Sequence, residues 1–270
     1  MAKYKKKRAR ELKHDKFRDT TMQVFDRLGD RLQGKGKAIL YGIVAVVVAA
    51  ALIGLFVRWR NRKADEARAA LGRAIAITQA PVSSAAPLPG TPAGRFSSHQ
   101  ERAQKAIEEF QKVAAKYGDP YRTEARYFIA TNLLLVDRNK GISDLGELGK
   151  NSNQEIAVLS KFALAQAKEA DNSLDEAAAL YKEVAALNGN VVTAENANFC
   201  LAMVYAKQGK KKEAADILFN IVDAARKAKD SEGNPKPQSQ AARQASQELQ
   251  KLDPARYDQL TPEAAPNLPF

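Results

Sequence analysis

Residues 161–184 read KFALAQAKEADNSLDEAAALYKEV, and residues 198–222 read NFCLAMVYAKQGKKKEAADILFNIV. Both stretches are rich in residues that favour helices, and they repeat one pattern of small and large apolar residues. The matching positions are Leu164, Ala165, Ala177 and Tyr181 in the first stretch and Leu201, Ala202, Ala214 and Leu218 in the second. Small Ala residues let two helices approach closely, so the pattern predicts a repeated pair of antiparallel helices joined by a turn.

Two weaker units precede these. Residues 125–148 place Ile129 and Ala130 in register, but they have Ile142 and Gly146 where Ala and a large apolar residue are expected. We therefore expect the second helix of this unit to be short or irregular. The earliest unit is split by a Pro-rich interruption, and its matching residues are Leu71, Gly72 and Ile75, followed by Ala106, Phe110 and Val113.

These spacings resemble a tetratricopeptide (TPR) unit. The helix-favouring composition without strand-like alternation predicts an all-α fold. We expect one N-terminal transmembrane helix, followed by the TPR-like α-solenoid of about three to four helix pairs that the resemblance implies. A generic helical bundle without superhelical stacking is the alternative.

The predicted transmembrane helix covers residues 38–57, AILYGIVAVVVAAALIGLFV, which contain no charge. At about 1.5 Å per residue this helix spans roughly the 30 Å of a bilayer's hydrocarbon core. The alternatives are a buried core helix and a cleavable signal peptide, but the charged flanks on both sides favour a true span. Tyr41 and Trp59 lie near its two ends as expected interfacial anchors.

Residues 1–37 form a basic tail with 13 bases and 5 acids, which we expect to lie in the cytoplasm. Bases near the span are nearly balanced, with five in residues 18–37 and six in residues 58–77, so the extra charges of MAKYKKKRAR decide the orientation. An apolar stripe predicts a short amphipathic helix in the tail, formed by Phe17, Thr21, Val24, Phe25, Leu28 and Leu32. This helix would lie on anionic headgroups or dock on ribosomal RNA or another cytoplasmic partner, or the stripe is a coincidence.

The rest of the chain divides by composition. We expect a post-membrane helix over 58–80, a Pro/Gly/Ser-rich insertion over 81–98 and the TPR-like repeat domain over 99–228. A linker over 229–240, a capping helix over 241–252 and a flexible C-terminal tail over 253–270 complete the organisation.

The repeat register predicts a partner-binding groove on the first helix of each pair. Its candidate residues are Tyr127, Thr131, Leu134, Phe162, Gln166, Glu169, Asn196, Phe199 and Met203. Such an apolar strip with few charges suits a peptide helix or an extended segment. The competing interpretation is that its aromatic residues belong to the core.

The sequence gives no basis for catalysis, and we expect no enzyme, no cofactor and no metal site. Its two histidines, His14 and His99, lie on opposite sides of the predicted span, and no phosphate-binding loop, nucleophile elbow or HExxH motif occurs. The lone Cys200 excludes a disulfide within the monomer and is expected to be a small buried apolar residue.

The order of tail, span and repeats, together with AIEEFQKVAAKYGDPYRTEARYFIA at 106–130, resembles bacterial membrane-anchored TPR proteins related to the ancillary SecYEG translocon subunit. RELKHDKF at 10–17 resembles an opening of related proteins. The resemblance implies a single-pass inner-membrane protein with its N-terminus in the cytoplasm and its TPR domain in the periplasm. The insertion at 81–97 and the imperfect middle unit depart from the family pattern.

We therefore expect a membrane-tethered adaptor that binds protein partners, with translocon subunits or periplasmic chaperones as candidates. Nucleic acid is not expected as a partner. The alternatives are a cytoplasm-facing tether for ribosomes or anionic lipid, and an assembly factor for envelope complexes.

Overall fold

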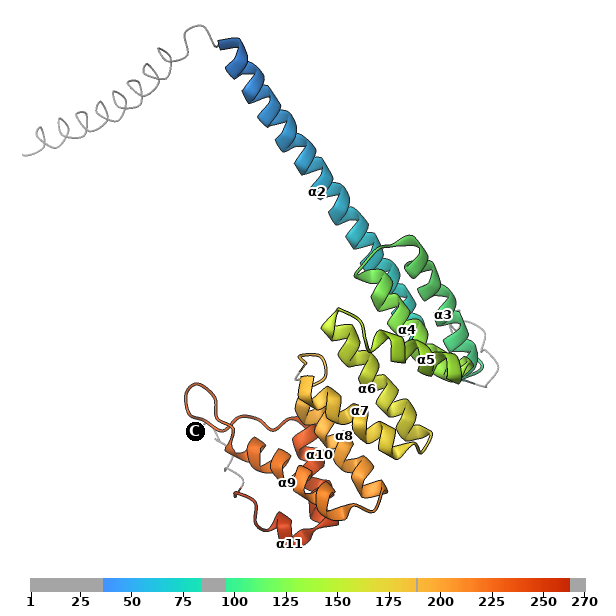
Figure 1. The fold of residues 1–270 in the computed structure, drawn as a ribbon, viewed down its shortest axis with the longest axis vertical. Helices are drawn as coiled ribbons and strands as arrows, with labels where there is room; N and C mark the ends of the chain where they lie inside the picture. The colour runs from blue at the N-terminus through green and yellow to red at the C-terminus, as the bar shows by residue number, and fades with distance from the viewer. Residues whose placement is uncertain (1–35, 84–95, 188, 263–270) are drawn as a thin grey trace, which may run out of the picture. The chain divides into compact units, whose positions relative to one another are not determined.

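The computed structural model describes residues 36–83, 96–187 and 189–262, and these residues are almost entirely α-helical (Figure 1). Its helices are α2 (Gly36–Thr78), α3 (His99–Lys116), α4 (Tyr121–Val136), α5 (Arg138–Leu148), α6 (Gln154–Ala170), α7 (Leu174–Leu187), α8 (Ala194–Lys207), α9 (Lys211–Lys227), α10 (Gln240–Leu252) and α11 (Pro254–Tyr257). Two isolated β-bridges, Val82–Phe96 and Lys229–Pro235, are the only β-structure within the described ranges.

The chain divides into two compact units, Met1–Asp65 and Glu66–Phe270, with the boundary inside α2. In the first unit, the side chains of residues 41–57 are exposed. This helix is long and apolar enough to cross a membrane. The predicted amphipathic helix of the tail lies outside the described residues.

The second unit is a TPR-like solenoid of helix pairs. Each helix from α3 to α10 packs against its neighbours along the chain, and Figure 1 shows them following one another from green to red. Named side chains cap several of the helices, as Asn153 does for α6 and Thr193 for α8. The all-α solenoid predicted from the repeats is therefore confirmed.

The first pair joins segments on either side of the Pro-rich insertion. Leu71 and Ala74 of α2 form one buried cluster with Phe110 and Val113 of α3. The Arg102 guanidinium donates a 3.0 Å hydrogen bond to the carbonyl oxygen of Ala80, which ties α3 to the end of the preceding segment. Residues 84–95 of the predicted insertion lie outside the described ranges.

The second pair departs from the predicted register. Gly141, Leu145 and Leu148 are buried in α5, whereas Ile142 and Gly146 are only half-buried. The shift comes from the short turn between the two helices. Asp137 is the only residue of this turn, and it is both the C-cap of α4 and the N-cap of α5, where its side chain accepts a hydrogen bond from the Lys140 N–H. The register assigned to α5 from the sequence was therefore wrong by one residue.

The C-terminal end is more structured than predicted. Ala242, Ala245 and Leu249 of α10 pack against α9, and Leu260, after α11, is 6% exposed in the same cluster. The Thr261 hydroxyl donates a 2.8 Å hydrogen bond to Asp223 of α9. The expectation of a flexible tail from 253 is thus wrong for residues 253–261, while residues 263–270 lie outside the described part.

Candidate partner-binding groove

The nine predicted groove residues lie on α4, α6 and α8, the first helices of three consecutive pairs. Gln166 and Asn196 are exposed, and the other seven side chains are half-buried. The exposed positions are held by well-capped helices, since the Asn196 N–H itself donates to the Thr193 side chain at 3.2 Å. Gln166 and Asn196 are therefore the two groove positions most open to a partner.

On α4 the predicted residues are partly used by the fold. Tyr127 and Leu134 pack against the buried cluster around Leu145, and burial raises the pKa of the Tyr127 hydroxyl. The Thr131 hydroxyl donates to the Phe128 carbonyl oxygen at 3.0 Å, a bond within its own helix. The predicted groove residues of α4 thus offer mainly ring and methyl surface.

The aromatic residues of α6 and α8 link neighbouring pairs. Phe162 meets Tyr181 edge to face with ring centroids 5.6 Å apart, and it contacts two buried clusters. Phe199 packs against the cluster that α8 and α9 form with α10. Each ring therefore packs against the core and keeps part of its surface exposed. That a partner binds this exposed part stays a prediction.

Glu169 is the central polar group of the predicted groove. Its carboxylate accepts a 2.9 Å hydrogen bond from the Tyr181 hydroxyl and a 2.5 Å bond from Lys207 Nζ, which joins α6, α7 and α8. Burial, reinforced by the negative charge of Glu169, raises the pKa of Cys200 to about 11. Glu169 was predicted as a groove residue, but this network could not be predicted, because Lys207 lies 38 positions further along the chain.

A cavity of about 520 Å³ opens elsewhere, between the start of α8 and the end of α9. Its lining includes Ile217, Ile221 and Ala224 with Glu195 and Asn198. None of the predicted groove residues lines this cavity. The sequence feature that could have indicated it is the run of small residues near the end of α9. The Glu195 carboxylate at its rim accepts a 2.6 Å hydrogen bond from Ser239, the N-cap of α10.

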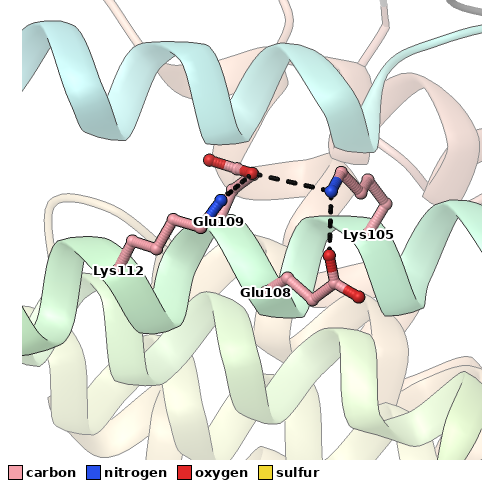
Figure 2. A network of polar contacts seen from close by, with 4 residues as sticks. All are labelled: Lys105, Glu108, Glu109 and Lys112. Carbon is pink, nitrogen blue, oxygen red and sulfur yellow. Dashed lines mark hydrogen bonds and ion pairs between the residues drawn. The ribbon is translucent and has the colours of Figure 1, made fainter.

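The charged side chains of α3 form an ion-pair ladder on its surface (Figure 2). Lys105 pairs with Glu108 at 2.8 Å, and Lys112 pairs with Glu109 at 2.6 Å. The hydrogen bond from Lys112 holds the pKa of Glu109 below its usual value. Such pairs at helical spacing are typical of a solvated face. No group of three or more His, Cys, Asp or Glu side chains in the described ranges could hold a metal ion.

Comparisons with known proteins concern the fold only. No family model matches the chain, and no curated protein matches its sequence. Among solved structures it is similar to a putative kinesin light chain with nearly identical TPR-like repeats from Podosopora anserina, with 18% identity over 71% of this chain and 87% of that chain and a TM-score of 0.48. A single-substitution variant of that protein gives the same values. The resemblance to ancillary translocon subunits stays a prediction.

Proposed function

We propose that this protein is a membrane-tethered adaptor whose repeats bind protein partners through the groove on α4, α6 and α8. One observation carries the proposal. The single helix α2 contains both the exposed apolar segment and Leu71 and Ala74, which belong to the core of the first repeat pair. A membrane anchor and a binding domain thus share one helix, as a tethered adaptor requires.

The anchor follows from the exposed apolar surface. Between Tyr41 and Trp59 the large apolar side chains are 47–71% exposed. A contiguous apolar surface of this kind requires a cover, and a lipid bilayer matches its length and its lack of charge. Tyr41 and Trp59 lie 18 positions apart, so they are separated by about 27 Å along the helix, close to the distance between the two interfacial layers.

The groove follows from the repeats. TPR-like solenoids present extended concave surfaces to protein partners. The predicted groove combines half-buried aromatic surface at Phe162 and Phe199 with exposed amides at Gln166 and Asn196. Aromatic anchors beside polar groups suit a peptide segment that is partly apolar.

We place the N-terminus in the cytoplasm and the repeats in the periplasm of a bacterial cell, with translocon subunits or periplasmic chaperones as partners. The basic tail supports this orientation. Protease digestion of intact spheroplasts that carry a C-terminal tag tests it. Cleavage from outside is expected, whereas protection until lysis would place the repeats in the cytoplasm and contradict the secretion role.

Site-specific photocrosslinking in cells tests the groove. The photoreactive residue replaces Gln166 or Asn196, and the matched controls replace Gln111 on α3 or Asn139 on α5, which are exposed residues of the same types on second helices. We expect defined adducts with translocon or chaperone proteins at the groove positions only. Equal adducts at all four positions, or none, would contradict partner binding in the groove.

The matching variants are Q166R/N196R and the control Q111R/N139R. In both variants the photoreactive residue replaces Met203, a third predicted groove position. Q166R/N196R adds bulk and charge to the groove and should abolish the adduct from this position, whereas Q111R/N139R should leave the adduct intact. Phe162 and Phe199 are poor choices for this test, because their rings pack in the core and Ser there would destabilise the domain.

A further inference from the structure

We propose that Arg58, Arg60, Arg62 and Lys63 form a collar at the end of the membrane segment that selects phospholipids with anionic headgroups. The inference rests on the proposed membrane anchor and adds a ligand class to it.

The collar concentrates positive charge where the apolar segment ends. Residues 58–63 read RWRNRK, and the first acid that follows the span is Asp65. All four basic side chains are exposed. Arg58, Arg60 and Arg62 form no ion pair with any other residue that the structure describes. These three guanidinium groups are therefore available to bind groups outside the described residues.

The collar extends around slightly more than half of the helix circumference. At about 100° per residue, Arg58 and Arg62 lie side by side, Lys63 lies roughly 140° from Arg58, and Arg60 lies near the opposite side. Lys63 Nζ lies 4.1 Å from the centroid of the Trp59 ring, which directs its ammonium group along the aromatic surface. Lipids on several sides of the helix therefore meet at least one base.

The height of the collar matches a headgroup layer. Arg58 to Lys63 spans about 7.5 Å along the helix, and the headgroup region of one leaflet is roughly 5–8 Å thick. Trp59, 53% exposed, lies within the collar, and indole rings favour this depth. The bases thus lie at the level of lipid phosphates and not in the aqueous phase beyond them.

The chemistry favours anionic over zwitterionic lipids. Guanidinium groups bind phosphate oxygens with two parallel hydrogen bonds, which any phospholipid can accept. In phosphatidylcholine the adjacent quaternary ammonium offsets the phosphate charge, whereas phosphatidylglycerol keeps a net negative charge. The electrostatic attraction between several bases and an anionic leaflet therefore favours phosphatidylglycerol over phosphatidylcholine.

Trp59 provides the measurement, because it is the only tryptophan of the chain. The full-length protein is reconstituted into vesicles of equal parts phosphatidylglycerol and phosphatidylcholine, with bromine on the acyl chains of one lipid or the other. Bromine quenches a neighbouring indole, so the two samples report which lipid contacts Trp59. We expect the relative association constant to favour phosphatidylglycerol roughly threefold to tenfold at low salt, and less at high salt.

The variant R58Q/R60Q/R62Q tests the collar and keeps Trp59 and Lys63. In this variant, the association constant for phosphatidylglycerol relative to phosphatidylcholine should fall to about one. The matched control K211Q/K212Q/K229Q removes the same charge from exposed positions of the second unit and should leave the ratio unchanged.

Each other outcome has a definite meaning. Equal quenching by both lipids in the unaltered protein would overturn the collar while leaving the membrane anchor intact. Selectivity that survives R58Q/R60Q/R62Q would also overturn it, because the selectivity would then come from elsewhere. No quenching by either lipid would overturn the anchor itself.

Discussion

Gly141 of α5 lies directly against the backbone of Ala130 in α4. A β-carbon at Gly141 would lie 2.9 Å from the Ala130 carbonyl oxygen and 2.8 Å from the Leu134 nitrogen. The corresponding residues of the next two pairs are Ala177 and Ala214, each fully buried. The α4–α5 pair is therefore packed so closely at this position that even Ala does not fit.

We predict that G141A destabilises the protein. The added methyl group meets backbone atoms that cannot rotate away, so the helices must separate, at a cost of about 1–3 kcal/mol that exceeds the gain in helix propensity of at most about 1 kcal/mol. Urea unfolding of the detergent-solubilised full chain, followed by circular dichroism at 222 nm, measures the change.

G146A is the matched control on the same helix. A β-carbon there meets no atom within 4 Å, so we expect the free energy of unfolding to rise by about 0.5–1 kcal/mol. If G141A were as stable as G146A, the close packing of α4 on α5 would be wrong.

Gly141 also shows where prediction from the sequence stops. The helices and their pairing could be predicted, because the spacing of small and large apolar residues repeats in residues 161–184 and 198–222. The register of α5 could not be predicted in this way, because the spacing of the later repeats was applied to a pair whose turn has a different length. The turns before α7 and α9 each have three residues, but the turn before α5 has only Asp137.

The helices that hold the predicted groove residues could also be predicted. Helical periodicity placed Phe162, Glu169 and Phe199 on first helices, where the structure has them. It could not show that Glu169 is bonded to Tyr181 and Lys207, because contacts between repeats depend on how the helices stack. The ordered end at Leu260 was missed for a related reason, since a single apolar residue in a polar segment has no periodicity to reveal it.

We predict that Y181F destabilises the protein by about 1–2 kcal/mol. Tyr181 is fully buried, and its hydroxyl donates a hydrogen bond to the carboxylate of Glu169 at 2.9 Å. A hydrogen bond to a charged group contributes more than a neutral one, and its loss leaves Glu169 with one fewer donor. Thermal unfolding followed by circular dichroism measures the effect.

Y205F provides the control for that change. Tyr205 is half-buried on α8, and its hydroxyl has no hydrogen-bond partner in the described part of the chain. We expect a change below about 0.5 kcal/mol. Equal effects of Y181F and Y205F would show that the Glu169 network contributes nothing to stability.

We predict that Cys200 reacts slowly with iodoacetamide in the folded protein. Its pKa is raised to about 11, chiefly by burial and further by Glu169, so at pH 9 it holds roughly 50–100 times less thiolate than an unperturbed Cys. Because the folded-state pKa lies above the unfolded value, the thiol's contribution to stability is complete below about pH 8.5 and is lost as the pH rises through 11. Mass spectrometry of the alkylated protein over time measures the rate.

The unfolded protein in concentrated urea is the reference for this rate. There the thiol is solvated, and labelling at pH 9 should be complete long before the folded sample has reacted. Equal rates in both samples would mean that α8 opens readily or that Cys200 is not packed against the buried cluster around Tyr181.

We predict that L260A destabilises the protein by about 2–4 kcal/mol, because a nearly buried Leu would leave a cavity among Leu218, Val222 and Leu249. Q259A changes the exposed neighbouring residue and should alter stability by less than about 0.5 kcal/mol. Urea unfolding of both variants separates the two interpretations of the C-terminal segment. If L260A matched Q259A, residues 253–261 would behave as the flexible tail that the sequence predicted. A large loss for L260A alone would show that the last repeat needs more than α10 to cover it, since the chain beyond α11 would then be filling part of the same core.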